Sequence, residues 1–396
     1  MKYNLIYLIS LLLVLSVACK KEELPINPEM VVNKKYPPIV QPDSIVYRTP
    51  FPEGKLPFPF HNPEWESNEL SKAMNKLFIV NNFGEFQSGD TKASAYFHDG
   101  LDIVLSNGTP IFAVSKGIVR AIIGSPPYYM SIIIEDLEHP GMAWSYTHVY
   151  YFAVKKGDVV AQGQYLARVN FKGLDHIHLS RSKLRKDGNW FSYFDIINIY
   201  PNDYFELEDH KPPVISTPFH YFRNNTDTYF SSDSMPTLSG DVDIVVSMRD
   251  ATDYSRGSLK GSGYFGDRLA VKSISYRILK DGKEVFSAPS FDFSKLEFDY
   301  ADDKWRKALT VYKMRTILEE APLPYDKFFS HYVITNARPG YKGIISPEDK
   351  NLAWNTGKKD AAGKPLFPNG VYTIEVTAYD NGGNSTTVQD SVRVKN

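Results

Sequence analysis

Two histidines stand one residue apart in the segment DHIHLS, at His176 and His178. The segment is apolar and β-branched, which favours a strand, and residues i and i+2 of a strand face the same side. On a helix of 3.6 residues per turn the same side chains would diverge by about 200°. Two adjacent imidazoles can act as a metal ligand and a base, although an isolated pair of this kind is more often structural.

A second polar pair lies upstream in YFHDGLDIV, where His98 and Asp102 are four residues apart around Gly100. Both side chains reach one point if the glycine lets the chain bend, and zinc accepts both ligand types. Together with one histidine of the downstream pair they make three protein ligands. The fourth position then stays open for water, as in catalytic zinc sites. The pattern HExxH is absent and there is one cysteine, which excludes the helical metalloprotease pattern and a Cys-rich structural site.

These residues must be positioned by β structure. Alternating apolar residues with breaks at Gly and Pro predict strands within 100–124, 130–137, 142–152 and 154–169. The last of these ranges should hold three short strands separated by turns. We expect one short helix within 64–80, with Ser67 as its N-cap. A mainly β domain at 61–208 follows from this pattern.

A second β region is expected at 209–396. The segment EDHKPPVIS marks the boundary, because paired prolines make a stiff connector. Alternation in 242–250 and 369–385, and a hairpin around Asp281-Gly282, predict an immunoglobulin-like β-sandwich. Residues 300–350, with a helix-like stretch at 303–322, are expected to be an insertion between its strands.

The N-terminus predicts export and a lipid anchor. One Lys and an apolar run at 5–18 precede Cys19, and this run is shorter than the roughly 20 residues of a membrane span. The stretch LSVAC resembles a lipobox, so residues 1–19 are predicted to be a lipoprotein signal with Cys19 as the lipidated residue. Residues 20–60 carry nine prolines and predict an extended tether. The acidic KKEELP resembles a surface-export signal, and a charged linker is the alternative.

The polar motifs together resemble peptidase family M23, the lysostaphin and LytM type of zinc peptidase. The resemblance covers roughly 80–182, and it departs from the family at Asp175, at Val149 and at Leu179-Ser180, all beside the expected substrate groove. The matching motifs are HxGxD at His98, Gly100 and Asp102; Tyr-x-His at Tyr146 and His148; the Gly-Asp-x-Val…Gly-Gln segment at Gly157, Asp158, Val160, Gly163 and Gln164; and HxH at His176 and His178.

The resemblance implies the fold of the family and a role for each residue. It implies an antiparallel β-sheet peptidase domain like the duplicated hybrid motif. His98, Asp102 and His178 would bind Zn²⁺, and His148 and His176 would be catalytic.

We therefore expect a lipid-anchored zinc metalloendopeptidase that cleaves peptide cross-links of bacterial peptidoglycan. A non-catalytic wall-binding or regulatory module and a surface protease acting on proteins are the alternatives. The expected location is the cell envelope, on either face of the outer membrane, and the expected state is a monomer. A net charge of −1 without a basic stripe gives no indication of nucleic-acid binding. The bond that is cleaved, any autoinhibition and the role of the C-terminal region stay open.

Overall fold

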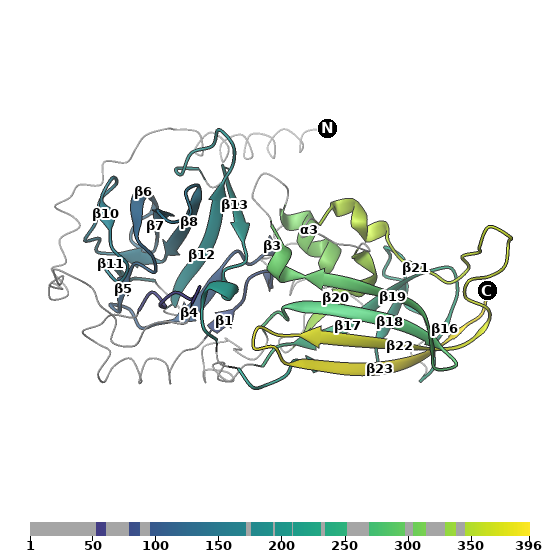
Figure 1. The fold of residues 1–396 in the computed structure, drawn as a ribbon. Coiled ribbons are helices and arrows are strands. Elements are labelled where there is room, and N and C mark those ends of the chain that lie inside the picture. The colour runs from purple at the N-terminus through teal and green to yellow at the C-terminus, as the bar shows by residue number, and fades with distance from the viewer. Residues whose placement is uncertain are drawn as a thin grey trace, which may run out of the picture. The chain divides into compact units, whose positions relative to one another are not determined.

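The computed structural model describes residues 53–60, 79–87, 96–171, 176–192, 195–207, 209–230, 234–251, 269–297, 304–313, 329–337 and 345–396. Cys19 and the predicted signal lie outside these ranges. Of the helix expected within 64–80 only Ile79 and Val80 are described, and they belong to a strand. Residues 39–396 form one compact unit. The fold is mainly β with antiparallel sheets, as the sequence predicts (Figure 1).

The N-terminal half is built on an eight-stranded antiparallel sheet. Its strands, in spatial order, are β1 (Ile79–Asn81), β4 (Leu101–Val104), β12 (His176–Leu184), β8 (Met142–Thr147), β7 (Tyr129–Asp136), β6 (Gly117–Ser125) and β10 (Val159–Val160), with β13 (Ile196–Ile199) also paired to β12. A three-stranded sheet holds β5 (Pro110–Phe112), β11 (Tyr165–Val169) and β9 (Val149–Tyr150), and β2 (Phe86–Gln87) pairs with β3 (Tyr96–Phe97).

One predicted strand is interrupted. The pattern in 142–152 indicates a single strand, but the structure ends β8 at Thr147 and starts β9 at Val149. Between them His148 has a φ of 64°, in the left-handed region that non-glycine residues seldom adopt. This residue turns the chain from the eight-stranded sheet into the three-stranded one. Residues 152–156, expected to include a strand, form none.

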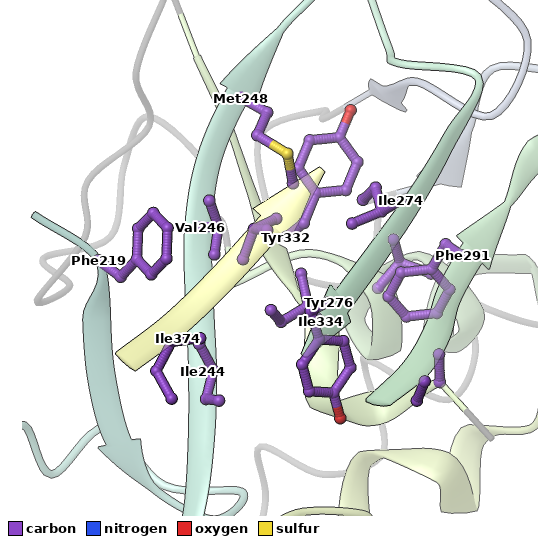
Figure 2. Close-up of a cluster of buried hydrophobic side chains, with 14 of the residues drawn as sticks. Phe219, Ile244, Val246, Met248, Ile274, Tyr276, Phe291, Tyr332, Ile334 and Ile374 are labelled. Atoms are coloured by element: carbon purple, nitrogen blue, oxygen red, sulfur yellow. The ribbon is translucent and has the colours of Figure 1, made fainter. Parts of the chain in front are cut away.

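The C-terminal half contains two five-stranded sheets that share one core (Figure 2). The first sheet holds β14 (Val214–Ile215), β17 (Asp241–Arg249), β15 (His220–Arg223), β20 (Ser330–Val333) and β21 (Trp354–Asn355). The second holds β16 (Thr237–Leu238), β23 (Ser385–Val394), β22 (Gly370–Tyr379), β18 (Ser273–Lys280) and β19 (Lys283–Asp292). Short helices are α3 (Lys304–Val311), η5 (Asn202–Tyr204), η6 (Phe293–Lys295), η7 (Ile334–Asn336) and η8 (Pro347–Asn351).

The sandwich follows from the alternation in its strands. Val242, Ile244, Val246 and Met248 of β17 are fully buried in the shared core. Burying each such side chain contributes on the order of 1.5–3 kcal/mol. Between β18 and β19, Asp281 (φ 50°) and Gly282 (φ 74°) are both left-handed, as a two-residue type I′ hairpin turn requires. Strand β20 lies within the range expected for an insertion and pairs with β17.

The segment before the first sequence motif belongs to both halves. Phe83, Phe86 and Phe97 are buried in the cluster that forms the core of the C-terminal sandwich. The Tyr312 hydroxyl donates to the Gly84 carbonyl at 2.8 Å. His98 follows Phe97 directly, so the packing of the C-terminal half helps to position the first histidine.

Candidate metal centre

Strand β12 brings the HxH pair beside the HxGxD segment. It pairs with β4 on one side and β8 on the other, and His178 stands opposite both Asp102 and Thr147. Residues directly opposite each other on neighbouring antiparallel strands project from the same face of the sheet. His178 and Asp102 therefore share a face, and His176 joins them because side chains alternate along a strand.

Gly100 lets β4 approach β12 closely. A Cβ at this position would lie 2.6 Å from the Leu179 carbonyl oxygen and 2.9 Å from both His178 Nε2 and Ser180 Oγ. The chain bends at Gly100, as the sequence suggested, but its φ is not in the left-handed region, so the glycine is required here for space.

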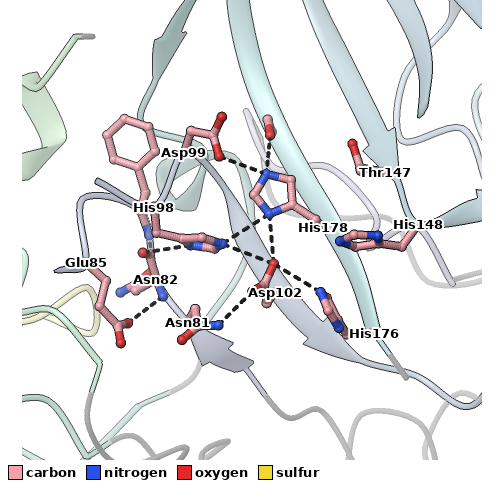
Figure 3. A network of polar contacts seen from close by, with 12 residues as sticks. Asn81, Asn82, Glu85, His98, Asp99, Asp102, Thr147, His148, His176 and His178 are labelled. Carbon is pink, nitrogen blue, oxygen red and sulfur yellow. Dashed lines mark hydrogen bonds and ion pairs between the residues drawn. The ribbon is translucent and has the colours of Figure 1, made fainter. Parts of the chain in front are cut away.

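Three potential ligand atoms converge at this point (Figure 3). His98 Nε2 lies 3.1 Å from Asp102 Oδ1 and 3.1 Å from His178 Nδ1, and His178 Nδ1 lies 2.8 Å from Asp102 Oδ1. Tetrahedral zinc with ligands at 2.0–2.1 Å separates its ligand atoms by about 3.3 Å. The two imidazoles and one carboxylate therefore fit zinc with small adjustments.

Neighbouring groups point these atoms inward. His98 Nδ1 donates to the Asn82 carbonyl at 3.0 Å, which leaves Nε2 as the ligand atom. The Asn81 amide donates to Asp102 Oδ2 at 2.7 Å, which leaves Oδ1 facing the histidines. Such outer hydrogen bonds fix tautomer and orientation around metal ions. Asn81 and Asn82 were not singled out in the sequence.

The pKa shifts in the cluster show that its residues favour a positive charge next to Asp102. Burial would raise the pKa of Asp102, but the charges of His98 and His176 and hydrogen bonds from the histidines hold it well below its usual value. Burial would lower the pKa of His178, but hydrogen bonds to Asp102 and Asp99 raise it to about 10. A bound cation would replace the proton on His178, so metal binding should release protons.

The two remaining motif histidines lie next to this cluster. His176 Nε2 is 3.7 Å from Asp102 Oδ1. The ring centroids of His148 and His176 are 4.6 Å apart, and His148 also packs against Phe171 at 4.1 Å. His148 Nδ1 donates to the Tyr128 carbonyl at 3.1 Å. All five predicted residues are therefore brought together, and the left-handed backbone of His148 directs its ring into the group.

Residues 96–190 match the family model of peptidase family M23, and this range contains all five residues. Over these residues the chain is similar to M23 peptidases. One similar solved structure is LytU, with 28% identity over 27% of this chain and 74% of that chain and a TM-score of 0.24. A zinc-containing peptidase from Vibrio cholerae has 24% identity over 26% of this chain and 33% of that chain, with a TM-score of 0.24. The catalytic domain of lysostaphin from Staphylococcus simulans has 22% identity over 32% of this chain and 90% of that chain, with a TM-score of 0.26. No curated protein matches the chain.

The other M23 motif residues are structural in this fold. The Tyr146 hydroxyl accepts from the Val114 amide at 2.9 Å in the core. Gly157 and Gly163 occupy turns with φ of 93° and 76°. The side chains that follow them close these turns, because Asp158 accepts from the Lys155 amide and Gln164 from the Ala161 amide, each at 2.9 Å. Asp175, a departure from the family, lies outside the described residues.

Two residues within 96–190 that the sequence did not single out contact His178. Its Nε2 lies 3.2 Å from Asp99 Oδ1 and 2.8 Å from Ser180 Oγ. The Asn198 amide in turn donates to Asp99 Oδ2 at 3.3 Å. Asp99 adjoins His98, and Ser180 follows His178 by two residues on the same strand face. The position of Asp99 directly after His98, one of the expected metal ligands, was the sequence signal that could have identified it.

Replacing Asp99 by asparagine should weaken zinc binding about 10- to 100-fold, because His178 loses a charged acceptor for its second nitrogen. Competition with a chromogenic chelator measures this affinity without relying on activity. Asp158→Asn, which changes a carboxylate in a remote turn, is the control and should bind zinc like the natural chain. Equal affinities for the two variants would show that Asp99 does not support the metal ligand.

Proposed function

We propose that the chain is a zinc-dependent endopeptidase that hydrolyses peptide cross-links of bacterial peptidoglycan. The observation that carries this proposal is the convergence of His98 Nε2, Asp102 Oδ1 and His178 Nδ1 within 3.1 Å of one another. Two further histidines beside this set, His148 and His176, distinguish it from a purely structural metal site. The M23 family match of residues 96–190 supports the peptide substrate.

Zinc held by the three ligands would supply a Lewis acid that activates water and polarises the carbonyl of the scissile bond. His148 donates its Nδ1 proton to Tyr128, so its Nε2 carries a lone pair. Burial lowers the pKa of His148 to about 4, and the charge of His176 adds to this effect. The ring is therefore neutral at pH 7, with Nε2 as its acceptor atom.

His176 stands closer to the ligand set, with its Nε2 near Asp102 Oδ1. This position suits a proton exchange with water next to the scissile bond. Because the rings of His148 and His176 adjoin, a proton taken from water by one of them can be returned to the leaving amine from the same side. General acid–base catalysis of this kind typically contributes about 10²- to 10⁴-fold.

The test is muropeptide analysis of purified sacculi treated with the protein, with and without a zinc chelator. We expect cross-linked fragments to decrease and new peptide termini to appear only when zinc is present. Casein is the parallel substrate. Digestion of casein but not of sacculi would favour the surface protease, and binding to sacculi without cleavage would favour the wall-binding module.

We further propose that a lipid on Cys19 anchors the protein in the cell envelope. No helix among the described residues is long and apolar enough to cross a membrane. Cys19→Ser is expected to move the protein from the membrane fraction to the soluble fraction, because a thioether-linked lipid can no longer form. Fractionation in high salt measures this, with Ser44→Ala in the predicted tether as the control. A Cys19→Ser protein that stays with the membranes would point to another anchor.

A further inference from the structure

A second group of side chains that could hold a metal ion consists of three aspartates outside the M23 motifs. Asp209 begins the linker to the C-terminal half, Asp250 follows β17 and Asp380 follows β22. All three are buried, with exposed fractions of 6%, 0% and 3%. One carboxylate oxygen of each residue lies within 4.8 Å of those of the other two.

The buried negative charge of Asp250 is not balanced by its described neighbours. Among the described residues neither of its carboxylate oxygens accepts a hydrogen bond of good geometry, and the backbone N–H of Ala251 offsets the effect of burial on its pKa only in part. No basic side chain among the described residues pairs with it. Burial, followed by the charges of Asp209 and Asp380, raises the pKa of Asp250 well above its usual value. A buried carboxylate without a partner is costly unless a counter-ion or a proton neutralises it.

The loop after β22 holds the three segments together. Asn384 donates from its backbone and side chain to Asp380, at 2.8 and 2.9 Å, and its side chain also donates to the Asp209 carbonyl at 2.9 Å. Gly382 packs so closely that a Cβ there would lie 2.5 Å from the same carbonyl oxygen. The loop thus fixes Asp209 and Asp380, and both carboxylates stay close to Asp250.

We propose that Asp209, Asp250 and Asp380 form a structural Ca²⁺ site that ties the linker to the sandwich. Calcium takes oxygen ligands at 2.3–2.6 Å, so two oxygens on one ion lie up to about 5 Å apart, which matches the spread of this cluster. All three side chains offer oxygen only, whereas zinc in proteins usually has nitrogen or sulfur ligands. Mg²⁺ keeps several waters and suits this buried position less well.

The site is tested on the full chain in detergent, which is first freed of calcium on a chelating resin and then loaded again with one equivalent of zinc. Isothermal titration with CaCl₂ should show one ion per chain. Calcium at 100-fold excess over its dissociation constant should raise the thermal unfolding midpoint by about 5 °C, because the ion binds the folded state and not the unfolded state. The asparagine amide offers calcium a neutral oxygen in place of a charged carboxylate, so Asp250→Asn should lose most of this rise. Without calcium it should unfold no earlier than the natural chain, because a buried charge has been removed.

Asp243→Asn is the matched control, since Asp243 lies on β17, the strand that Asp250 follows, is 2% exposed and has a pKa raised by burial to about 7. It should keep the calcium response. The proposal is overturned if the natural chain binds no calcium at 10 mM, or if Asp250→Asn responds like the control. Protons shared among the carboxylates would then be the neutralising charge. Titration of the natural chain decides the matter even if Asp250→Asn does not fold.

Discussion

His176→Ala should abolish hydrolysis while zinc stays bound, whereas His178→Ala should lose both. The two residues lie on the same face of β12, so the effects of each change on the fold should be similar. Only His178 places a nitrogen among the three converging atoms, at 2.8 Å from Asp102 Oδ1. His176 stands beside them, and losing acid–base catalysis alone typically costs about 10²- to 10⁴-fold.

Zinc per chain is measured by elemental analysis, and turnover is measured on sacculi in long incubations. His139→Ala is the control, because this exposed histidine lies in the loop after β7 and its side chain contacts the end of that strand, at Asp136. It should keep zinc and activity. If His176→Ala loses zinc and His178→Ala retains it, the two roles are exchanged. If neither change affects turnover, the site is not catalytic.

Gly100→Ala should remove most of the activity although it changes no polar group. The added Cβ would lie 2.6 Å from a backbone oxygen of β12, so β4 and β12 must separate. Overpacking of this kind costs about 1–3 kcal/mol of stability. His178 and Asp102 face each other across these strands, and a misplacement of about 1 Å can cost 10²-fold in rate.

Thermal unfolding, zinc affinity and turnover are measured together for Gly100→Ala. Gly357→Ala is the control, because its φ is ordinary and its nearest neighbours would lie 3.7 and 3.8 Å from the new Cβ. It should behave like the natural chain. A Gly100→Ala protein with unchanged zinc affinity would mean that the strands accommodate the methyl group without moving the ligands.

Much of the site could be predicted because its signals are local. The period of two in a strand aligns His176 with His178, and the spacing of HxGxD keeps His98 near Asp102. The same rule predicted the buried face of β17, and Asp281-Gly282 predicted a turn. Such patterns depend on bond geometry within a few residues, which the sequence specifies directly.

Other features depended on the pairing of distant segments, which only the tertiary structure decided. The register that sets Asp102 opposite His178 brings His178 Nδ1 to Asp102 Oδ1, while Asp99 and Ser180 contact Nε2. His148 adopts a left-handed conformation at the point where the chain passes from one sheet into another. Asp209, Asp250 and Asp380 are far apart in the chain, and each alone resembles a turn carboxylate. The three carboxylates are buried together, and need a counter-charge, only because the linker, the end of β17 and the end of β22 meet in the folded chain.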